Sequence, residues 1–328
     1  MQTPFNPSLY QGRIEPYENS LAQYYYQHIK DYTNQAICLI GFACDQGVNR
    51  NQGRIGAKNS PDVIKSTFAK LPIAWRLQKS FKDLDNLIGD KGNIICDDDN
   101  KIQDGILEIA QDNYAKEITT IIQNNSLPIA IGGGHEIAFS SFIGLYNSLS
   151  NTQNIGIINL DAHFDLRSDQ YATSGTPFLQ IANLLQNNDE PFYYLPIGIS
   201  EFGNTASLFE KAKNLGVHFI SEDDCYHLPF DIIKKQIDAF IYQVDCIYLT
   251  LDLDCLQSAF MPAVSAVNSK GLSLDFVENT LSHIIKSGKV KMIDIAEFNP
   301  NYDINGQGAK VAARLLAGII QTYLLQGK

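Results

Sequence analysis

The architecture of this chain can be predicted outward from one segment, Asn159-Leu-Asp-Ala-His-Phe-Asp-Leu-Arg167. The apolar run at 155–160 is typical of a buried strand in a parallel sheet. Asp161, His163 and Asp165 follow at alternate positions, so they point to one side if the strand continues and surround the mouth of a loop if it ends. Open α/β sheets bind ligands at this end of their strands, and carboxylates with imidazole favour Mn, Zn, Fe or Co over Ca or Mg. The alternative is a polar loop in which an aspartate caps the next helix.

A second segment, Leu127-Pro-Ile-Ala-Ile-Gly-Gly-Gly-His135-Glu136, is an apolar strand that runs into three glycines and a histidine. A helical pattern follows at 137–149. The glycines allow a tight turn, which leaves His135 at a helix start beside the sheet edge. A glycine-rich turn of this kind can also bind a phosphate, but the glycine and lysine spacings of the known phosphate-binding motifs are missing here.

A third strand, Cys246-Ile-Tyr-Leu-Thr-Leu-Asp252-Leu-Asp254, also ends in carboxylates. The period of two places Asp252 and Asp254 on the same side. The carboxyl ends of parallel strands meet at one edge of a sheet, so the three segments bring six side chains together there. The predicted metal ligands are His135, Asp161, His163, Asp165, Asp252 and Asp254.

Four carboxylates gathered in one cleft repel each other and acquire raised pKa values unless cations lie among them. Two divalent ions carry the four positive charges that balance them. The charge count therefore favours a two-metal centre, in which a bridging water ionised near neutral pH acts as the nucleophile.

The three motifs Gly-Gly-Gly-His-Glu, Asp-Ala-His-Phe-Asp and Thr-Leu-Asp-Leu-Asp, in this order, resemble those of the ureohydrolase superfamily of arginase, agmatinase and formimidoylglutamase. The resemblance extends from about Ile40 to the C-terminus. It implies two Mn²⁺ ions bridged by Asp161 and Asp252. It also implies that His135 and Asp165 bind one ion and that His163 and Asp254 bind the other.

Composition restricts the classes of function. The chain has 328 residues, 45 % of them apolar, which is ordinary for a protein with a sizeable core. A net charge of −11, without a basic run, argues against a nucleic-acid partner. We find no signal-peptide pattern and no apolar run of membrane-spanning length, so we expect a cytoplasmic protein without a membrane partner.

The six cysteines form no C-x-x-C pair and predict neither a zinc site nor a disulfide framework. Most are expected to be small core residues.

The chain is predicted to consist of an N-terminal arm, residues 1–35, and one arginase-like catalytic domain, residues 36–328. The arm is polar and rich in Tyr, Asn and Gln, with a helical piece near 21–28. The resemblance implies a homo-oligomer, and two placements of the arm stay open: across a neighbouring subunit or over its own. After residue 35, about eight strands alternate with helices, which predicts a single three-layer α/β/α domain with a mainly parallel sheet. The predicted strands are 36–42, 93–96, 127–131, 155–160, 192–200, 217–220, 246–254 and 290–298; the predicted helices are 60–70, 104–123, 137–149, 177–185, 205–215, 229–244, 273–286 and 308–325.

Glu297 lies near the end of the last predicted strand, 290–298, and the resemblance implies that it pairs with the amidinium of the substrate. Together with Asp165 it is our candidate for catalysis. Arginases carry a proton-shuttle histidine just after a Ser-Gly pair, but residues 174–178 here read Ser-Gly-Thr-Pro-Phe. Another group, or water, must therefore protonate the leaving amine.

Arg167 occupies a position where arginases have asparagine. Arginine repels a second cationic group and binds carboxylates well, so we expect an acidic substrate. The loop Gly41-Phe-Ala-Cys-Asp-Gln-Gly-Val-Asn-Arg-Asn-Gln-Gly-Arg54 is similar to that of formimidoylglutamases. Arg54, and also Arg50, either hold a second carboxylate or face solvent. Asn204 either contacts the substrate or caps the helix that follows it.

By resemblance, the expected enzyme is a binuclear hydrolase that cleaves N-formimino-L-glutamate to L-glutamate and formamide in histidine degradation, with a metal-bridging hydroxide attacking the formimino carbon. Its partner is a small amidine that carries carboxylates. One alternative is a ureohydrolase that releases urea from a guanidino acid such as 4-guanidinobutyrate. The other is a family member without catalytic activity, which the complete set of metal ligands argues against.

Overall fold

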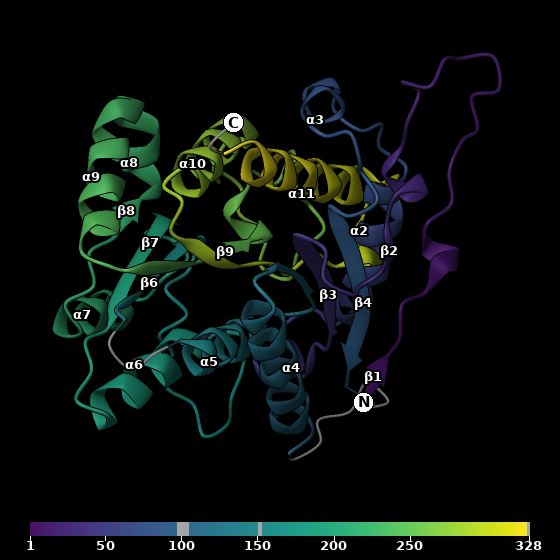
Figure 1. Ribbon diagram of the computed structural model, residues 1–328. Coiled ribbons are helices and arrows are strands. Elements are labelled where there is room, and N and C mark those ends of the chain that lie inside the picture. Colours follow the sequence, from purple (N-terminus) through teal and green to yellow (C-terminus); the bar gives the residue numbers. More distant parts are fainter. Residues whose placement is uncertain (97–104, 150–152, 327–328) are drawn as a thin grey trace.

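Ten strands form one sheet in the computed structural model, which describes residues 1–96, 105–149 and 153–326 (Figure 1). The strand order is β1-β4-β3-β5-β10-β9-β6-β7-β8, and β2 also pairs with β4. Only the β1–β4 pair is antiparallel within the described part of the chain. The strands are β1 (Gln2–Thr3), β2 (Lys30–Asp31), β3 (Ile37–Ala43), β4 (Ile88–Ile95), β5 (Leu127–Gly132), β6 (Ile155–Leu160), β7 (Tyr193–Ile199), β8 (Ile220–Ser221), β9 (Cys246–Asp252) and β10 (Val290–Ala296).

Helices cover both faces of the sheet, so the predicted three-layer α/β/α fold with a mainly parallel sheet is confirmed. One layer contains α2 (Ser60–Ala69), α9 (Phe230–Tyr242), α10 (Leu274–Ile285) and α11 (Gln307–Leu325). The other contains α4 (Ile106–Gln123), α5 (Ile137–Ser148), α6 (Pro177–Asn187) and α7 (Ala206–Asn214). The shorter helices are α1 (Gln46–Arg50), α3 (Trp75–Ser80) and α8 (Glu222–His227), and the 3₁₀ turns are η1 (Pro7–Leu9), η2 (Tyr25–Gln27), η3 (Ala57–Asn59), η4 (Leu253–Cys255) and η5 (Pro300–Tyr302).

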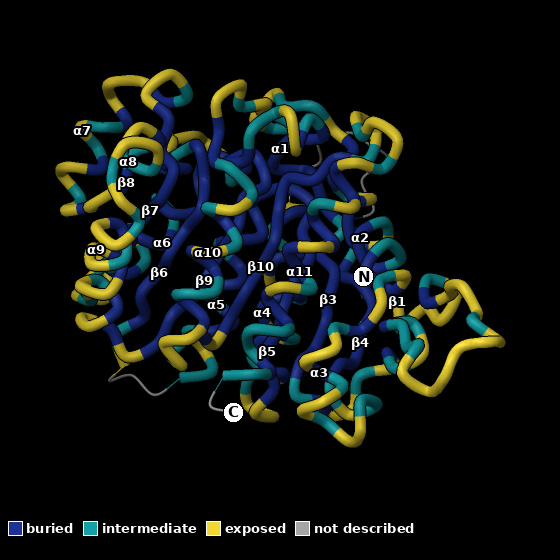
Figure 2. The backbone as a smooth tube through the Cα atoms, turned by 90° about the horizontal axis from the view of Figure 1, so that it is seen from above, coloured by how far each residue is buried: buried dark blue, intermediate teal, exposed yellow. Residues whose placement is uncertain are grey.

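Two hydrophobic cores result, one on each face of the sheet. In β3, Ile37 and Leu39 pack in the first core, whereas Cys38 and Ile40 pack in the second. All four are fully buried. Burial on both faces explains why these strands are continuous apolar runs without polar alternation. Figure 2 shows the same arrangement, with buried strands inside and exposed backbone in the surrounding loops.

The predicted N-terminal arm packs against the rest of its own chain. Its two short strands pair with β4, and the Tyr10 hydroxyl donates to Asp90 Oδ2 over 2.8 Å. The Tyr25 ring packs against Phe68 with 4.3 Å between centroids. Residues 11–22 form a mostly exposed loop at the side of the molecule (Figure 2), and the helix predicted near 21–28 is only the short turn η2. Strands of two residues and a 3₁₀ turn of three residues are too short to give a hydrophobic periodicity, so they could not be predicted from the sequence.

Several predicted boundaries differ from those of the structure. β9 ends at Asp252 rather than Asp254, because the Asp252 side chain accepts the N–H of Asp254 and caps the turn η4. β4 begins at Ile88, five residues before the predicted start. Helix α8 was not predicted, and the predicted start of α4 at residue 104 lies outside the described residues.

The cysteine spacing indicated no disulfide framework, but the structure contains one disulfide. Cys44 and Cys96 are joined, with 5.1 Å between their Cα atoms. They directly follow β3 and β4, whose last paired residues are Ala43 and Ile95. The pairing arises from strand register, which brings together two cysteines 52 positions apart in sequence. Cys38, Cys246 and Cys255 are buried core residues, as predicted.

No helix in the described ranges combines the length and the apolarity needed to cross a membrane.

Candidate metal centre

The six predicted ligands gather at the carboxyl ends of neighbouring strands. His135 lies in the turn between β5 and α5, and three ligands follow β6. Asp252 is the last residue of β9, and Asp254 lies in η4. Since β5, β10, β9 and β6 are consecutive in the sheet, these ends are adjacent. The sheet topology therefore places all six side chains at one edge.

The ligand atoms form two groups that share Asp161. In the first, His135 Nδ1 lies 2.9 Å from Asp165 Oδ2, 3.1 Å from Asp252 Oδ2 and 3.2 Å from Asp161 Oδ2. In the second, His163 Nδ1 lies 3.0 Å from Asp254 Oδ2 and 3.6 Å from Asp161 Oδ1.

Within each group, one donor atom per residue lies within 4.8 Å of all the others, which is suitable for holding an ion. The shared position of Asp161 agrees with a bridging role. Asp252 belongs only to the first of these groups.

Without bound cations this cluster would be electrostatically unfavourable. Burial raises the pKa of Asp165 to about 6, and it also raises the pKa values of Asp252 and Asp254. Burial lowers the pKa values of His135 and His163, but the surrounding carboxylates outweigh it and raise both well above the usual value. A largely buried set of two imidazoles and four carboxylates fits divalent transition-metal ions, which replace protons as the neutralising charge.

Backbone conformation and local hydrogen bonds fix the ligands. Asp161 Oδ1 accepts the N–H of His163 over 2.7 Å, and Asp161 Oδ2 accepts the amide of Asn159 over 3.0 Å. Asp165 and Glu297 both have positive φ, 48° and 70°. This conformation is unfavourable for residues with a Cβ and is typically kept at functional sites.

Glu297 is attached to the His135 turn. Its N–H donates to Gly133 O over 2.8 Å, and its Oε1 accepts the N–H of His135 over 2.8 Å. Burial raises its pKa to about 8. The turn needs glycine at 133, because a Cβ there would collide with the carbonyl oxygen of Cys44.

Residues 35–321 match the model of the arginase family. The chain belongs to the arginase family.

Individual members of the arginase family are similar over nearly the whole chain. A formimidoylglutamase from Psychrobacter cryohalolentis is 48 % identical over 336 aligned positions, covering 97 % of both chains. The crystal structure of formimidoylglutamase from Bacillus subtilis superposes with a TM-score of 0.81 at 19 % identity, covering 96 % of both chains. That of Trypanosoma cruzi formiminoglutamase with Mn²⁺ gives a TM-score of 0.75 at 24 % identity, covering 89 % of this chain and 94 % of the other.

The arginines predicted to bind substrate differ in their surroundings. Arg167 is exposed, its aliphatic part lies against Gly175, and its guanidinium makes no hydrogen bond within the described ranges. Arg54 donates through Nε and Nη2 to the carbonyl groups of Ser265 and Val264, and its guanidinium lies 4.0 Å above the Tyr302 ring. Its Nη1 makes no hydrogen bond with the residues that the structure describes.

Arg50 is largely buried. Its guanidinium donates to both carboxylate oxygens of Glu108 and to the carbonyl of Ala172. This ion pair makes a loop-anchoring role a sufficient explanation for Arg50.

Asn204 is buried, and its side-chain amide forms hydrogen bonds with the loop that carries His163. Its oxygen accepts the N–H of Phe164, and its nitrogen donates to the carbonyl oxygens of Ala162 and Ser200. Both N–H groups are thus already used, which favours a positioning role over direct contact with substrate.

Two residues in contact with the site were not singled out from the sequence. Thr250 Oγ1 lies 2.9 Å from His135 Nε2, and Asn159 contacts Asp161. Both residues belong to the sequence motifs that identified the ligands. Their contacts with the ligands depend on how the strands pair, which the sequence does not show.

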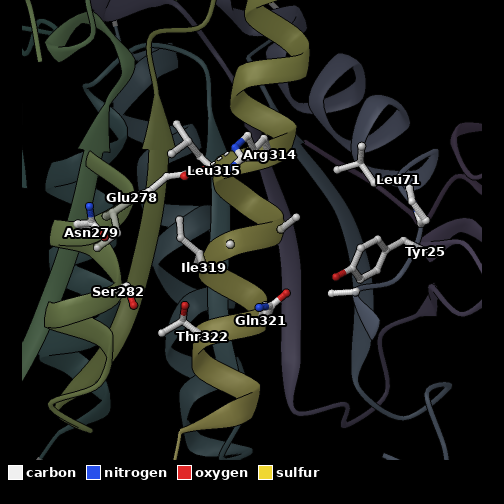
Figure 3. Close-up of a pocket in the computed structure, with 15 residues that line it drawn as sticks. Tyr25, Leu71, Glu278, Asn279, Ser282, Arg314, Leu315, Ile319, Gln321 and Thr322 are labelled. Atoms are coloured by element: carbon white, nitrogen blue, oxygen red, sulfur yellow. Dashed lines mark hydrogen bonds and ion pairs between the residues drawn. The ribbon is translucent and has the colours of Figure 1, made fainter. Parts of the chain in front are cut away.

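A separate hollow of about 580 Å³ lies between α10, α11 and residues 71–74 (Figure 3). Arg314 and Glu278 form an ion pair at its edge. Its lining includes none of the predicted site residues, so the metal centre is the better candidate for catalysis.

Proposed function

We propose that this protein hydrolyses N-formimino-L-glutamate to L-glutamate and formamide, using two Mn²⁺ ions. The observation that carries the proposal is the gathering of two histidines and four aspartates beside Glu297 at one sheet edge. The 48 % identical relative named formimidoylglutamase supports the choice of substrate. The choice of metal is supported by the T. cruzi formiminoglutamase, which was crystallised with Mn²⁺.

In this proposal, His135 and Asp165 would hold one ion and His163 and Asp254 the other, with Asp161 and Asp252 as ligands shared by both. Two bound divalent ions lower the pKa of water and so supply a nucleophile near neutral pH. The side chain of Asp165 is 11 % exposed, against 0 %, 4 % and 6 % for Asp161, Asp252 and Asp254. As the most accessible of the four carboxylates, Asp165 is our candidate for holding a proton during the reaction.

Glu297 is assigned to the amidinium of the substrate. Its buried carboxylate is fixed by the His135 N–H, and a cation beside it favours the charged form. Arg167 is assigned to a carboxylate of the glutamate moiety because its exposed guanidinium makes no hydrogen bond with the described residues and can bind a carboxylate. Arg54 is assigned to the second carboxylate, with Tyr302 supporting its guanidinium.

The test is an analysis of products from two substrates with Mn²⁺-loaded protein. We expect L-glutamate and formamide from N-formimino-L-glutamate, and no urea from 4-guanidinobutyrate. Urea without formamide would move the substrate to the guanidino acids while leaving the metal centre intact. The absence of both products from protein with two bound ions would support a non-catalytic family member.

Three further proposals rest on the sequence. We assign catalysis to residues 36–328, with residues 1–35 as a supporting arm. We infer a homo-oligomer and a cytoplasmic location, which size measurement in solution and cell fractionation test.

A further inference from the structure

A buried aspartate lies behind the metal centre and is not used in the mechanism above. Asp294 in β10 has no exposed surface. Its Oδ2 accepts hydrogen bonds from Ser141 Oγ and from the Tyr248 hydroxyl, each over 2.6 Å. Among the residues that the structure describes, its Oδ1 has no hydrogen-bond partner. A buried acceptor without a donor is unfavourable, the more so when it is charged, so a role for Oδ1 is expected.

Thr250 connects this aspartate to a metal ligand. Thr250 and Asp294 are direct register partners on β9 and β10. Thr250 Oγ1 also lies 2.9 Å from Nε2 of His135. Burial raises the pKa of Asp294, and this rise is opposed by the charge of His135 and by interactions with neighbouring hydroxyl groups, including that of Thr250.

The metal-binding form of His135 sets the direction of these hydrogen bonds. His135 Nδ1 faces the carboxylates, so a metal ion there requires Nδ1 without a proton and Nε2 with one. Nε2–H then donates to Thr250 Oγ1. The Thr250 hydroxyl hydrogen must point elsewhere, and Asp294 Oδ1 is an acceptor in need of a donor.

We propose that Asp294 is a positioning residue that acts through Thr250 to keep the His135 imidazole in the tautomer that binds metal at Nδ1. The proposed series of hydrogen bonds runs from Asp294 Oδ1 to the Thr250 hydroxyl and on to His135 Nε2–H. This inference rests on the proposed metal centre but not on the identity of the substrate. Hydrogen-bonded groups behind a ligating histidine commonly change metal affinity about 10- to 100-fold.

Asp294→Asn tests the direction in which these hydrogen bonds donate, with almost no change in side-chain volume. Ser141 and Tyr248 both donate to one side of the carboxylate, so the amide oxygen takes that side and the NH₂ group faces Thr250. Thr250 then donates to His135 Nε2, which favours a proton on Nδ1 and opposes metal binding. We expect Mn²⁺ binding at the His135 site to weaken about 10- to 100-fold, with the second site less affected.

Thr250→Val and Thr250→Ser are a second pair of test variants. Valine removes the hydroxyl at similar volume and should weaken Mn²⁺ binding at the His135 site. Serine keeps the hydroxyl and should bind Mn²⁺ there as the wild type does. Ser141→Ala is the matched control, because it removes a hydrogen bond of 2.6 Å to Asp294 Oδ2 and leaves the Thr250 hydroxyl in place.

Isothermal titration of the full-length metal-free variants with Mn²⁺ measures the two binding steps without substrate. NMR of ¹⁵N-histidine in the Zn²⁺-loaded protein should show a hydrogen-bonded Nε2–H that is lost in Thr250→Val. Wild-type Mn²⁺ affinity in both Asp294→Asn and Thr250→Val would overturn the proposal. An equal loss in Ser141→Ala would also overturn it, since core packing would then explain the effect. A wild-type protein that binds Mn²⁺ but releases no glutamate would contradict the proposed function and leave this inference standing.

Discussion

At the scale of single residues, the site depends on backbone conformations that its side chains do not favour. Asp165 and Glu297 lie in the left-handed region, which costs roughly 1–2 kcal/mol for a residue with a Cβ. Each is held there by surrounding contacts: the Asp165 carbonyl accepts the N–H of Phe178, and Glu297 bonds to Gly133 and His135. Their side chains are thus directed at the metal cluster by tertiary structure.

Replacing Glu297 by Gln separates metal binding from catalysis. The neutral amide keeps the shape but loses the charge that pairs with the amidinium. We expect the Mn²⁺ content to stay unchanged. The loss of the charge should cost about 2–5 kcal/mol of transition-state stabilisation, so kcat/KM should fall roughly 30- to 5,000-fold. Elemental analysis and steady-state kinetics check this. A variant that has lost its metal would instead assign Glu297 to the metal site.

Replacing Arg167 by Gln should weaken substrate binding more than turnover. A hydrogen bond to a charged group contributes about 1.5–3 kcal/mol, so KM should rise roughly 10- to 150-fold. Arg76→Gln, at an exposed arginine on α3, is the control for the change in overall charge. Equal KM values in both variants would remove Arg167 from the substrate site.

At the scale of elements, the sequence was most informative where a strand is buried on both faces. The predicted strand 155–160 coincides with β6, and the predicted ligands lie together because parallel strands share an edge. Contacts between distant segments could not be predicted. The Cys44–Cys96 disulfide depends on the register of β3 and β4, and the use of the Asn204 amide depends on two loops meeting. Asp252 also ends β9 earlier than periodicity suggests, because its side chain competes for the backbone N–H of Asp254.

The disulfide should contribute measurably to stability. Closing a loop with a sequence separation of 52 stabilises the folded state by about 4 kcal/mol in the chain-entropy estimate. We therefore expect the double variant Cys44→Ala/Cys96→Ala to unfold at lower denaturant concentration than the oxidised wild type, and at about the same concentration as the reduced wild type. Denaturant titrations check this, and thiol counting should give four free thiols before reduction and six after it. Six thiols in the untreated protein would contradict the bond.

At the scale of the whole molecule, the acidic cluster links stability to metal and to pH. In the metal-free protein, burial raises the pKa of Asp165 from 3.8 to about 6 and that of Glu297 from 4.5 to about 8. The folded state then binds more protons than the unfolded state in these windows, so stability falls as pH rises through them. The raised pKa values of His135 and His163 act in the same direction, because the stability they contribute is present below 6.5 and is lost as pH rises through their folded values.

We therefore expect metal-stripped protein to melt at a lower temperature at pH 8 than at pH 6. Added Mn²⁺ should raise the melting temperature more at pH 8, because the ions replace the protons that the carboxylates lose. Thermal unfolding at the two pH values, with and without metal, checks both expectations. A stripped protein that is more stable at pH 8 would show that the cluster does not control stability in this range.

The most direct test of the two-metal account is the rate of L-glutamate release from N-formimino-L-glutamate as Mn²⁺ is titrated into stripped protein. We predict no release without metal and a rise that saturates at two ions per chain. Asp161→Asn should lose metal and activity together, because Asp161 belongs to both ligand groups. Release that is independent of Mn²⁺, or a fully active Asp161→Asn protein, would contradict the account.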